Sequence, residues 1–287
     1  MRNYPPLPRF YRQWIKDNDL TYFNVVVKQS DLYIGAGHNL KVKALKSLLK
    51  HRISLEKYIE HHPQFLTTLE PYQVEANAPF IVREMSQASQ IAGVGPMAAV
   101  AGAIAEAVGK DLLAFTPEVI VENGGDIFLK TMKKRLVGIY AGQSSFTGKI
   151  ALEINPGETP LGICTSSGTI GHSLSLGSAD AVIIVSSSAA LADATATAIG
   201  NIVKTKENIS QALEKAQEVP GLQGIVVIVG NEMGVWGKVK IVSLNTPSLL
   251  AQFLALRQYF RTRLTSGNNT FTSLFQLQRL AYALNNL

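Results

Sequence analysis

Residues 161–203 combine hydroxyl side chains, glycines and small apolar residues, and they carry almost no bulky charge before Lys204. A solvated loop would normally contain Lys, Glu, Asn and Pro, so this composition predicts a packed segment rather than a surface connection. Asp193 lies inside the run LADATATAIG, where an ionised carboxylate needs a hydrogen-bond or ion partner. The segment therefore predicts a binding or catalytic site inside a folded domain.

The size and composition predict a globular protein with a substantial core. The chain has 287 residues, of which 46% are hydrophobic, so folding needs no disulfide or metal staple. Cys164 is the only cysteine, which excludes an intramolecular disulfide and indicates a reducing compartment, with the cytoplasm as the expectation. Because no apolar run reaches the roughly 18 residues that span a bilayer, we expect no membrane partner.

The net charge of +6 raises the question of an anionic partner. The basic residues are spread over separate segments, near residues 41–52, 130–135 and 257–263, rather than gathered in one recognition motif. This distribution argues against nucleic-acid binding. A phosphorylated small molecule would be attracted by the same charge and is the ligand class that we expect.

The hydrophobic spacing predicts mixed helices and strands, with no linker or repeat that divides the chain. Residues 21–34 alternate as a strand pair with a turn near Ser30, and residues 96–109 predict a buried helix whose small residues let another backbone approach closely. Residues 39–51 and 54–62 predict two helices with basic, solvated faces. Further strands are expected at 118–122, 127–130, 136–141, 150–154, 181–186 and 225–229, and further helices at 189–203, 209–217 and from 247 onward.

The first motif that could carry chemistry is GluAsnGlyGlyAspIle, at the end of a Val/Ile strand. Gly124 and Gly125 permit positive φ angles and a close backbone approach, while Asn123 and Asp126 offer side-chain contacts beside the turn. A tight hairpin between two strands explains the glycines equally well. The acids Glu122 and Asp126 favour the functional interpretation, because they flank the turn in an otherwise buried strand.

The second motif is the hydroxyl-rich run Thr165, Ser166, Ser167 and Gly168, which continues to Thr169. Its hydroxyls and backbone N–H groups could bind an anion such as a phosphate. An ordinary hydroxyl-rich turn is the alternative. The chain contains neither GxxxxGKS nor a GxGxxG that follows a strand, so the two best-known nucleotide-binding loops are absent from the sequence.

The third motif is Asp193 with Thr197, whose i, i+4 spacing places both side chains on one face of a helix. Their oxygens could share a hard cation such as Mg²⁺. Alternatively, Asp193 caps or hydrogen-bonds a neighbouring loop, and Thr197 bonds back to its own helix. His172 follows the hydroxyl-rich run and could act as a general acid or base, although a lone histidine is more often a structural hydrogen-bonding residue.

Taken in order, these motifs resemble those of the ApbE-like flavin transferases. ValGluAsnGlyGlyAspIle is similar to the family's NAGGDI, CysThrSerSerGly to its ATSG loop, and LeuAlaAspAlaThrAlaThrAlaIleGly to its DALATAL helix. The resemblance implies an α+β fold with mixed or antiparallel sheets and packed helices, FAD as the bound cofactor, and Mg²⁺ at the diphosphate. It further implies transfer of FMN to a threonine of a protein acceptor, with Asp193 and Thr197 as metal ligands and a backbone carbonyl from residues 95–98.

The sequence departs from the family pattern at two places. GlyHisSerLeuSerLeuGly keeps His172 as the candidate base but lacks the aspartate and proline that follow the family's histidine. The family's LysGly motif before the central helix has no lysine counterpart in GlyProMetAlaAla. We therefore expect one ApbE-like domain over residues 1–287, with a helical C-terminal extension from about residue 247. Its function is either metal-dependent transfer of FMN or a nucleotidyl group, or non-catalytic binding of a flavin or phosphorylated metabolite. A third hypothesis is an assembly subunit that docks on a partner through the C-terminal helix. Burial of that helix within its own chain is the simpler explanation of its apolar stripe.

Overall fold

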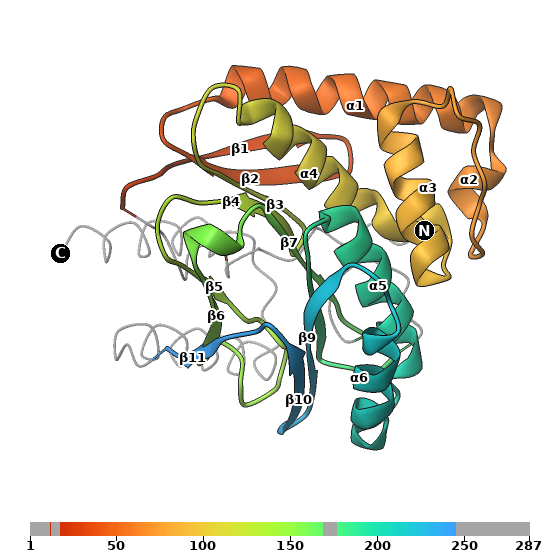
Figure 1. Ribbon diagram of the computed structural model, residues 1–287. Coiled ribbons are helices and arrows are strands. Elements are labelled where there is room, and N and C mark those ends of the chain that lie inside the picture. Colours follow the sequence, from red (N-terminus) through yellow and green to blue (C-terminus); the bar gives the residue numbers. More distant parts are fainter. Residues whose placement is uncertain (1–11, 13–17, 169–176, 245–287) are drawn as a thin grey trace, which may run out of the picture. The chain divides into compact units, whose positions relative to one another are not determined.

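The computed structural model describes residues 12, 18–168 and 177–244, and these residues form two antiparallel sheets with helices (Figure 1). The larger sheet has eight strands in the order β1-β2-β3-β4-β7-β8-β9-β10, and the smaller has the order β11-β6-β5. The large-sheet strands are β1 (Thr21–Val27), β2 (Ser30–Ala36), β3 (Val119–Asn123), β4 (Asp126–Lys130), β7 (Leu161–Ser166), β8 (Ala181–Ser186), β9 (Leu222–Val229) and β10 (Glu232–Gly237). The small sheet contains β5 (Arg135–Gly138), β6 (Ile150–Ile154) and β11 (Ile241–Ser243).

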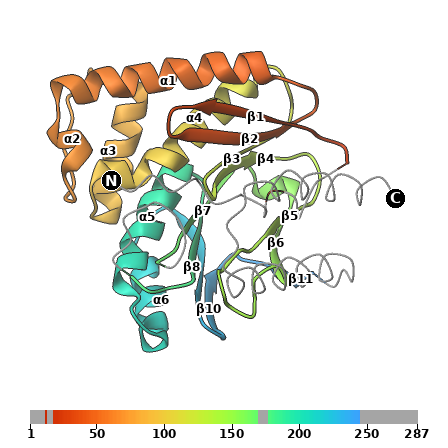
Figure 2. The ribbon, with the colours of Figure 1, turned by 180° about the vertical axis from the view of Figure 1, so that it is seen from behind.

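The helices cover one face of the large sheet, and the small sheet lies on the other (Figures 1 and 2). The helices are α1 (Lys41–His61), α2 (Gln64–Thr67), α3 (Phe80–Ala92), α4 (Val100–Leu112), α5 (Ala189–Ile202) and α6 (Ile209–Gln217), with 3-10 turns η2 (Pro96–Ala99), η3 (Pro156–Glu158) and η4 (Lys206–Asn208). The predicted α+β class with antiparallel sheets is confirmed. The predicted C-terminal helical extension lies outside the described residues.

Both faces of the large sheet are buried at its centre. All six residues of β8 are buried, because alternate side chains enter two separate cores. Val182 and Ile184 pack in the core on the helix side, whereas Ile183 and Val185 pack in the core that includes residues of the small sheet. A strand covered on both faces reads as a continuous apolar run, which is why residues 181–186 contain no polar residue until Ser186.

Two expectations about the helices are corrected. The two helices predicted over residues 39–62 form the single helix α1 (Lys41–His61). Ser54 lies within it and donates its hydroxyl to the Lys50 carbonyl at 3.0 Å instead of capping a new helix. The sequence reading also omitted α3, which begins after Pro79 and ends at Gly93 in the left-handed conformation. Among the described residues no single helix is long and apolar enough to cross a membrane, and α3 with the segment Pro96–Leu112 meets that test only as a pair bent by 106°.

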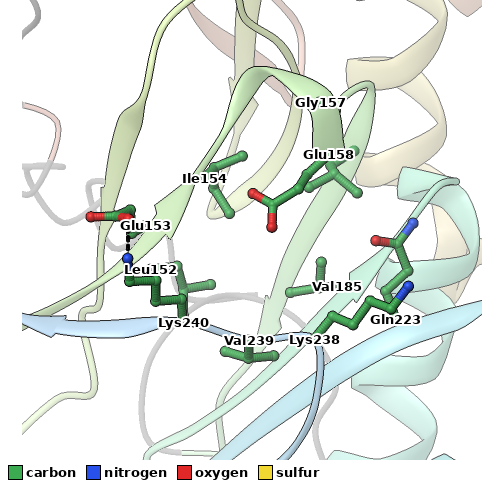
Figure 3. Close-up of a pocket in the computed structure, with 11 residues that line it drawn as sticks. Leu152, Glu153, Ile154, Gly157, Glu158, Val185, Gln223, Lys238, Val239 and Lys240 are labelled. Carbon is green, nitrogen blue, oxygen red and sulfur yellow. Dashed lines mark hydrogen bonds and ion pairs between the residues drawn. The ribbon is translucent and has the colours of Figure 1, made fainter.

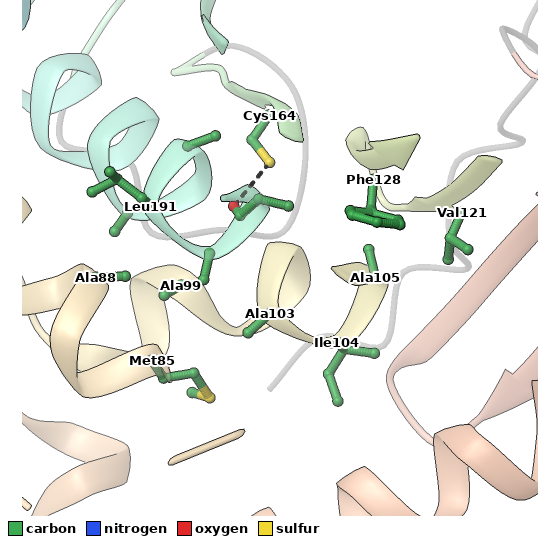
Figure 4. Close-up of a cluster of buried hydrophobic side chains, with 14 of the residues drawn as sticks. Met85, Ala88, Ala99, Ala103, Ile104, Ala105, Val121, Phe128, Cys164 and Leu191 are labelled. Atoms are coloured by element: carbon green, nitrogen blue, oxygen red, sulfur yellow. Dashed lines mark hydrogen bonds between the residues drawn. The ribbon is translucent and has the colours of Figure 1, made fainter. Parts of the chain in front are cut away.

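The predicted helix of small residues is confirmed as η2 followed by α4, and it packs closely against its neighbours (Figure 4). A Cβ atom added at Gly102 would lie 2.2 Å from the Ala189 carbonyl oxygen. A Cβ atom added at Gly109 would lie 2.2 Å from the ring of Phe128. The sequence predicted that the helix ends at Gly109. Gly109 instead lies inside α4, which continues to Leu112.

The contact at Gly102 gives a stability prediction. We expect Gly102→Ala to lower the free energy of unfolding by about 1–3 kcal/mol, because the new methyl group would force the backbones of α4 and α5 apart. This loss should outweigh the gain of roughly 1 kcal/mol from the higher helix propensity of alanine. Urea denaturation measures the change. Gly157→Ala is the control, since nothing lies within 4 Å of its added Cβ, and equal stability of both variants would contradict the close packing.

Candidate functional site

The β3–β4 hairpin holds the first predicted motif. Asn123 pairs with Asp126 across a two-residue turn in which Gly124 has φ 73° and Gly125 has φ 107°. These left-handed angles explain both glycines, so the tight-hairpin reading is confirmed. The Gly125 N–H donates to Glu122 Oε1 at 2.7 Å, and Arg12 holds the other carboxylate oxygen of Glu122. The turn is therefore fixed by an ion pair whose cation lies 110 residues away in the sequence.

The polar side chains of this hairpin point into the protein on the helix side. Asn123 and Asp126 are 7% and 8% exposed. Asn123 Nδ2 donates to the Ala101 carbonyl at 3.1 Å, at the start of α4. Asp126 Oδ1 accepts from the Thr165 N–H at 3.3 Å, at the end of β7. The hairpin thus connects the second predicted motif to the N-terminal end of α4.

Asp193 reaches the same helix end from α5. Its Oδ2 accepts from the Gly102 N–H at 2.9 Å, in the first turn of α4. The capping alternative for Asp193 is therefore confirmed, with a helix end in place of the expected loop. Enclosure by the protein and the nearby Asp126 carboxylate raise the pKa of Asp193 well above its usual range, although the Gly102 and Ala101 N–H groups act in the opposite direction.

A second contact joins these two helices, with the carboxylate on α4 and the N–H groups on α5. The sequence motifs did not predict it. Glu106 of α4 is 6% exposed, and its Oε2 accepts from the N–H groups of Ala189 and Ala190 at 2.7 and 3.3 Å. Ser188, the N-cap residue of α5, also donates its hydroxyl to Glu106. Lys110 forms an ion pair with the other carboxylate oxygen at 2.7 Å. The sequence contains a signal for this contact, because Glu106 is the only charged residue between Gly93 and Lys110 and an isolated charge in an apolar helix needs a partner.

The hydroxyl-rich run lies only partly at the point where the β3–β4 hairpin meets α4 and α5. Thr165 and Ser166, predicted as part of a hydroxyl-rich turn, belong instead to strand β7, and the Thr165 N–H donates to Asp126. The side chains of Ser166 and Ser167 are half-buried, and Gly168 is exposed. Gly168 allows a close approach, since a Cβ there would lie 2.1 Å from the Gly177 carbonyl oxygen. His172 lies outside the described residues.

Cys164 precedes this run and is fully buried (Figure 4). Its Sγ donates to the Ala189 carbonyl at 3.3 Å, so β7 is tied to the first turn of α5. Burial, together with the carboxylates of Asp126 and Asp193, raises the pKa of the Cys164 thiol well above its usual value. A thiol held in this protonated form is a poor nucleophile, so Cys164 acts as a structural donor.

The two threonines that follow Asp193 differ in their surroundings. Thr197 is half-buried one turn after Asp193, and its hydroxyl makes no hydrogen bond to another described residue. Thr195 is fully buried, and within the described part of the chain its hydroxyl also has no partner. Thr197 is thus the more accessible of the two threonines. Its predicted role as a metal ligand stays a prediction.

The oxygen atoms at this meeting point suit a hard cation better than a soft one. Asp126 and Asp193 supply carboxylates and Thr197 a hydroxyl, which are ligands of the kind that Mg²⁺ and Ca²⁺ prefer. No group of three or more His, Cys, Asp or Glu side chains with metal-binding geometry occurs among the described residues. A cation here would consequently complete its coordination with backbone oxygens, water or ligand phosphates.

A separate hollow of about 340 Å³ lies on the other side of the large sheet, beside the small sheet (Figure 3). Its lining mixes apolar side chains from both sheets with charged ones, and the carboxylate of Glu158 points into it. Glu153 at its edge is paired with Lys240 at 2.6 Å. None of the predicted site residues lines this hollow, so it is distinct from the meeting point of the motifs.

A family model and several relatives match most of this chain. A family model described as "AbpE bacteria" matches residues 12–235, which include all the described site residues. A UPF0280 protein of Methanocaldococcus jannaschii is 48% identical over 202 residues, covering 69% of this chain and 82% of the relative. A UPF0280 protein of Methanosarcina barkeri is 42% identical over 220 residues, covering 76% and 87%. Among solved structures, the flavin transferase ApbE from Vibrio cholerae has a TM-score of 0.49 at 12% identity and covers 76% of this chain and 96% of its own.

The capping role of Glu106 predicts a large effect of its removal. We expect Glu106→Ala to lower the free energy of unfolding by roughly 2–3 kcal/mol, because the N–H groups of Ala189 and Ala190 lose a charged acceptor. Lys110→Ala is the matched control and should cost at most about 1 kcal/mol, since this half-exposed ion pair is screened by solvent. Urea denaturation compares the two variants. Equal losses would show that Glu106 stabilises only through Lys110.

The raised pKa of Asp193 predicts a pH dependence. Asp193→Asn keeps an acceptor for the Gly102 N–H but removes the titrating group. Between the unfolded pKa of about 4 and the raised folded pKa, the native protein holds more protons than the unfolded chain, so stability falls as pH rises. In a chelating buffer, we expect the unfolding free energy of the wild type minus that of Asp193→Asn to decrease from pH 4 upward. A difference that increases with pH would contradict the assignment.

Proposed function

Because the chain belongs to the family described as AbpE bacteria, we propose that it binds a flavin nucleotide, with FAD as the first candidate, where the β3–β4 hairpin meets α4 and α5. The observation that carries this proposal is the convergence of three distant motifs on one helix end. Asp126 bonds Thr165, Asn123 bonds Ala101, and Asp193 bonds Gly102, the next residue of the same helix.

A divalent cation is part of the proposal, because two carboxylates on different elements influence each other at this point. The Asp126 charge raises the pKa of Asp193, which means that ionising both carboxylates at once is unfavourable. Asp193, Asp126 and the hydroxyl of Thr197 would hold a Mg²⁺ ion through hard oxygen ligands. When bound, this ion would neutralise the negative charge of a diphosphate.

Other residues near the hairpin would contact the phosphates and the rest of the ligand. The half-buried hydroxyls of Ser166 and Ser167 would donate to phosphate oxygens. The Gly168 N–H already donates to the Ala179 carbonyl at 2.9 Å, so Gly168 would contribute the space that a side chain would otherwise fill. Gly124 and Gly125 allow a ligand to approach the hairpin backbone, because neither has a side chain. The proposed contacts therefore come from the same residues that the sequence motifs predicted.

Transfer of FMN is the further reaction that we propose to test. In that reaction the hydroxyl oxygen of a protein threonine bonds to the FMN phosphorus, the diphosphate P–O bond breaks, and AMP leaves. His172 is the candidate base that removes the hydroxyl proton. The alternative is a protein that binds a flavin or phosphorylated metabolite without turnover, since the residues that surround the family's histidine differ here.

Calorimetric titration of FAD in Mg²⁺ and in chelator tests binding, and chromatography of the nucleotides tests turnover. We expect binding that depends on Mg²⁺ and is lost in Asp193→Asn, while the fold is retained because asparagine can still cap α4. Glu214→Gln, an exposed change of the same kind on α6, should bind as the wild type does. Undiminished binding in chelator would contradict the cation, and no binding in either condition would contradict the flavin site.

Release of AMP would support the transferase and justify a search for its protein acceptor. Intact FAD after binding would support the non-catalytic alternative.

A further inference from the structure

Helix α1 has a row of aliphatic side chains on the face that points away from the protein. Val42, Leu45, Leu49 and Ile53 are 81%, 39%, 38% and 48% exposed. Their spacing of three and four residues aligns them in one stripe along three turns. The core-facing side of the helix is a different row that includes Ala44, Leu48, Leu55 and Tyr58. The apolar residues that predicted this helix therefore fall on two opposite faces.

A second apolar face needs an explanation, because a surface helix of a globular protein normally buries one stripe and exposes a polar one. In Figure 1, α1 runs along the outer edge of the described fold, with its neighbouring elements on one side. Four aligned exposed aliphatic residues differ from the scattered single ones that most protein surfaces carry. The row therefore indicates an interaction surface.

The charges that α1 carries beside the first half of the stripe are basic. Lys41, Lys43, Lys46 and Lys50 are exposed there, and no acidic residue occurs in α1 before Glu56, one turn after Ile53. Lys50 also pairs with Asp111 of α4 at 3.4 Å, so Lys41, Lys43 and Lys46 contribute most of the unpaired positive charge. Lys43 lies 4.6 Å from the centre of the Phe115 ring, and that ring is 47% exposed. An apolar stripe bordered by lysines is complementary to a surface that has an apolar interior beneath a layer of negatively charged groups.

We propose that this surface, the outer face of α1 (Val42, Leu45, Leu49 and Ile53 with Lys41, Lys43, Lys46 and Lys50), binds an anionic lipid bilayer, with the helix lying parallel to it. The aliphatic side chains enter the headgroup boundary, and the lysines extend along them to the lipid phosphates. This proposal differs from our expectation of no membrane partner, which rested on the absence of a spanning segment.

The composition of the surface favours a bilayer over a protein partner. Protein interfaces are enriched in Tyr, Trp and Arg and depleted in Lys, whereas this stripe is aliphatic and bordered by lysines. A second copy of the same face would place lysines against lysines, which opposes self-association. The long straight helix also offers a line of contacts to a flat surface rather than a pocket for a side chain.

Sedimentation with lipid vesicles tests the proposal without any flavin. We expect binding to vesicles of equal parts phosphatidylcholine and phosphatidylglycerol, little binding to phosphatidylcholine alone, and weaker binding at high salt. Val42→Ser with Leu49→Ser should lower the vesicle affinity at least tenfold. Both side chains are exposed, so the fold should be retained and circular dichroism can verify it.

The basic chain could bind anionic vesicles through its net charge alone, so a charge-matched control is needed. Lys41→Gln with Lys46→Gln should weaken binding by roughly fivefold per lysine. Lys206→Gln with Lys238→Gln removes the same charge from exposed positions elsewhere and should have a much smaller effect. Equal effects of the two pairs, or no loss on removing the aliphatic residues, would overturn the proposal. So would a dimer in light scattering that Val42→Ser with Leu49→Ser converts to a monomer.

Discussion

Helices α4 and α5 hold each other's N-terminal ends, and much of the described structure depends on this exchange. Asp193 of α5 accepts from the first turn of α4, and Glu106 of α4 accepts from the first turn of α5. A helix N-terminus has unsatisfied N–H groups and a partial positive charge, so each carboxylate gains backbone partners there. Glu106 has the Lys110 ammonium as a further partner. Gly102 makes the exchange possible, because only a residue without a Cβ lets the Ala189 carbonyl come so close.

The sheet is fastened to the same two helix ends. Asn123 donates to the Ala101 carbonyl of α4, and Cys164 donates to the Ala189 carbonyl of α5. The strand ends that carry the polar motifs are consequently held against the helices whose termini carry the complementary backbone groups. This explains how residues near 123, 165 and 193 come together, although the elements between them belong partly to the small sheet on the opposite face.

Local pattern predicted the parts of this arrangement that depend on local chemistry. The glycine pair predicted the β3–β4 turn, the small residues predicted a closely packed α4, and the family resemblance is confirmed. The hydroxyl-rich motif predicted a loop at Cys164 to Ser166, whereas these residues belong to strand β7. The motif could not predict this, because the strand depends on pairing with β4 and β8, which are distant in the sequence. Glu106 was missed for a similar reason: its partners are backbone N–H groups of another helix, which side-chain motifs do not reveal.

Asp193 has a structural role at the end of α4 and a proposed role as a metal ligand. The Gly102 and Ala101 N–H groups stabilise its charge, yet burial and Asp126 together have the larger effect, so the net result is a raised pKa. If capping were its only role, an asparagine would satisfy the helix end without this electrostatic penalty. Retaining two interacting carboxylates beside Thr197 makes physical sense when a third charge of opposite sign joins them. In the proposed site, the capping bond would orient Asp193 for that ion, and the stability of α4 and the occupancy of the site would then be coupled properties.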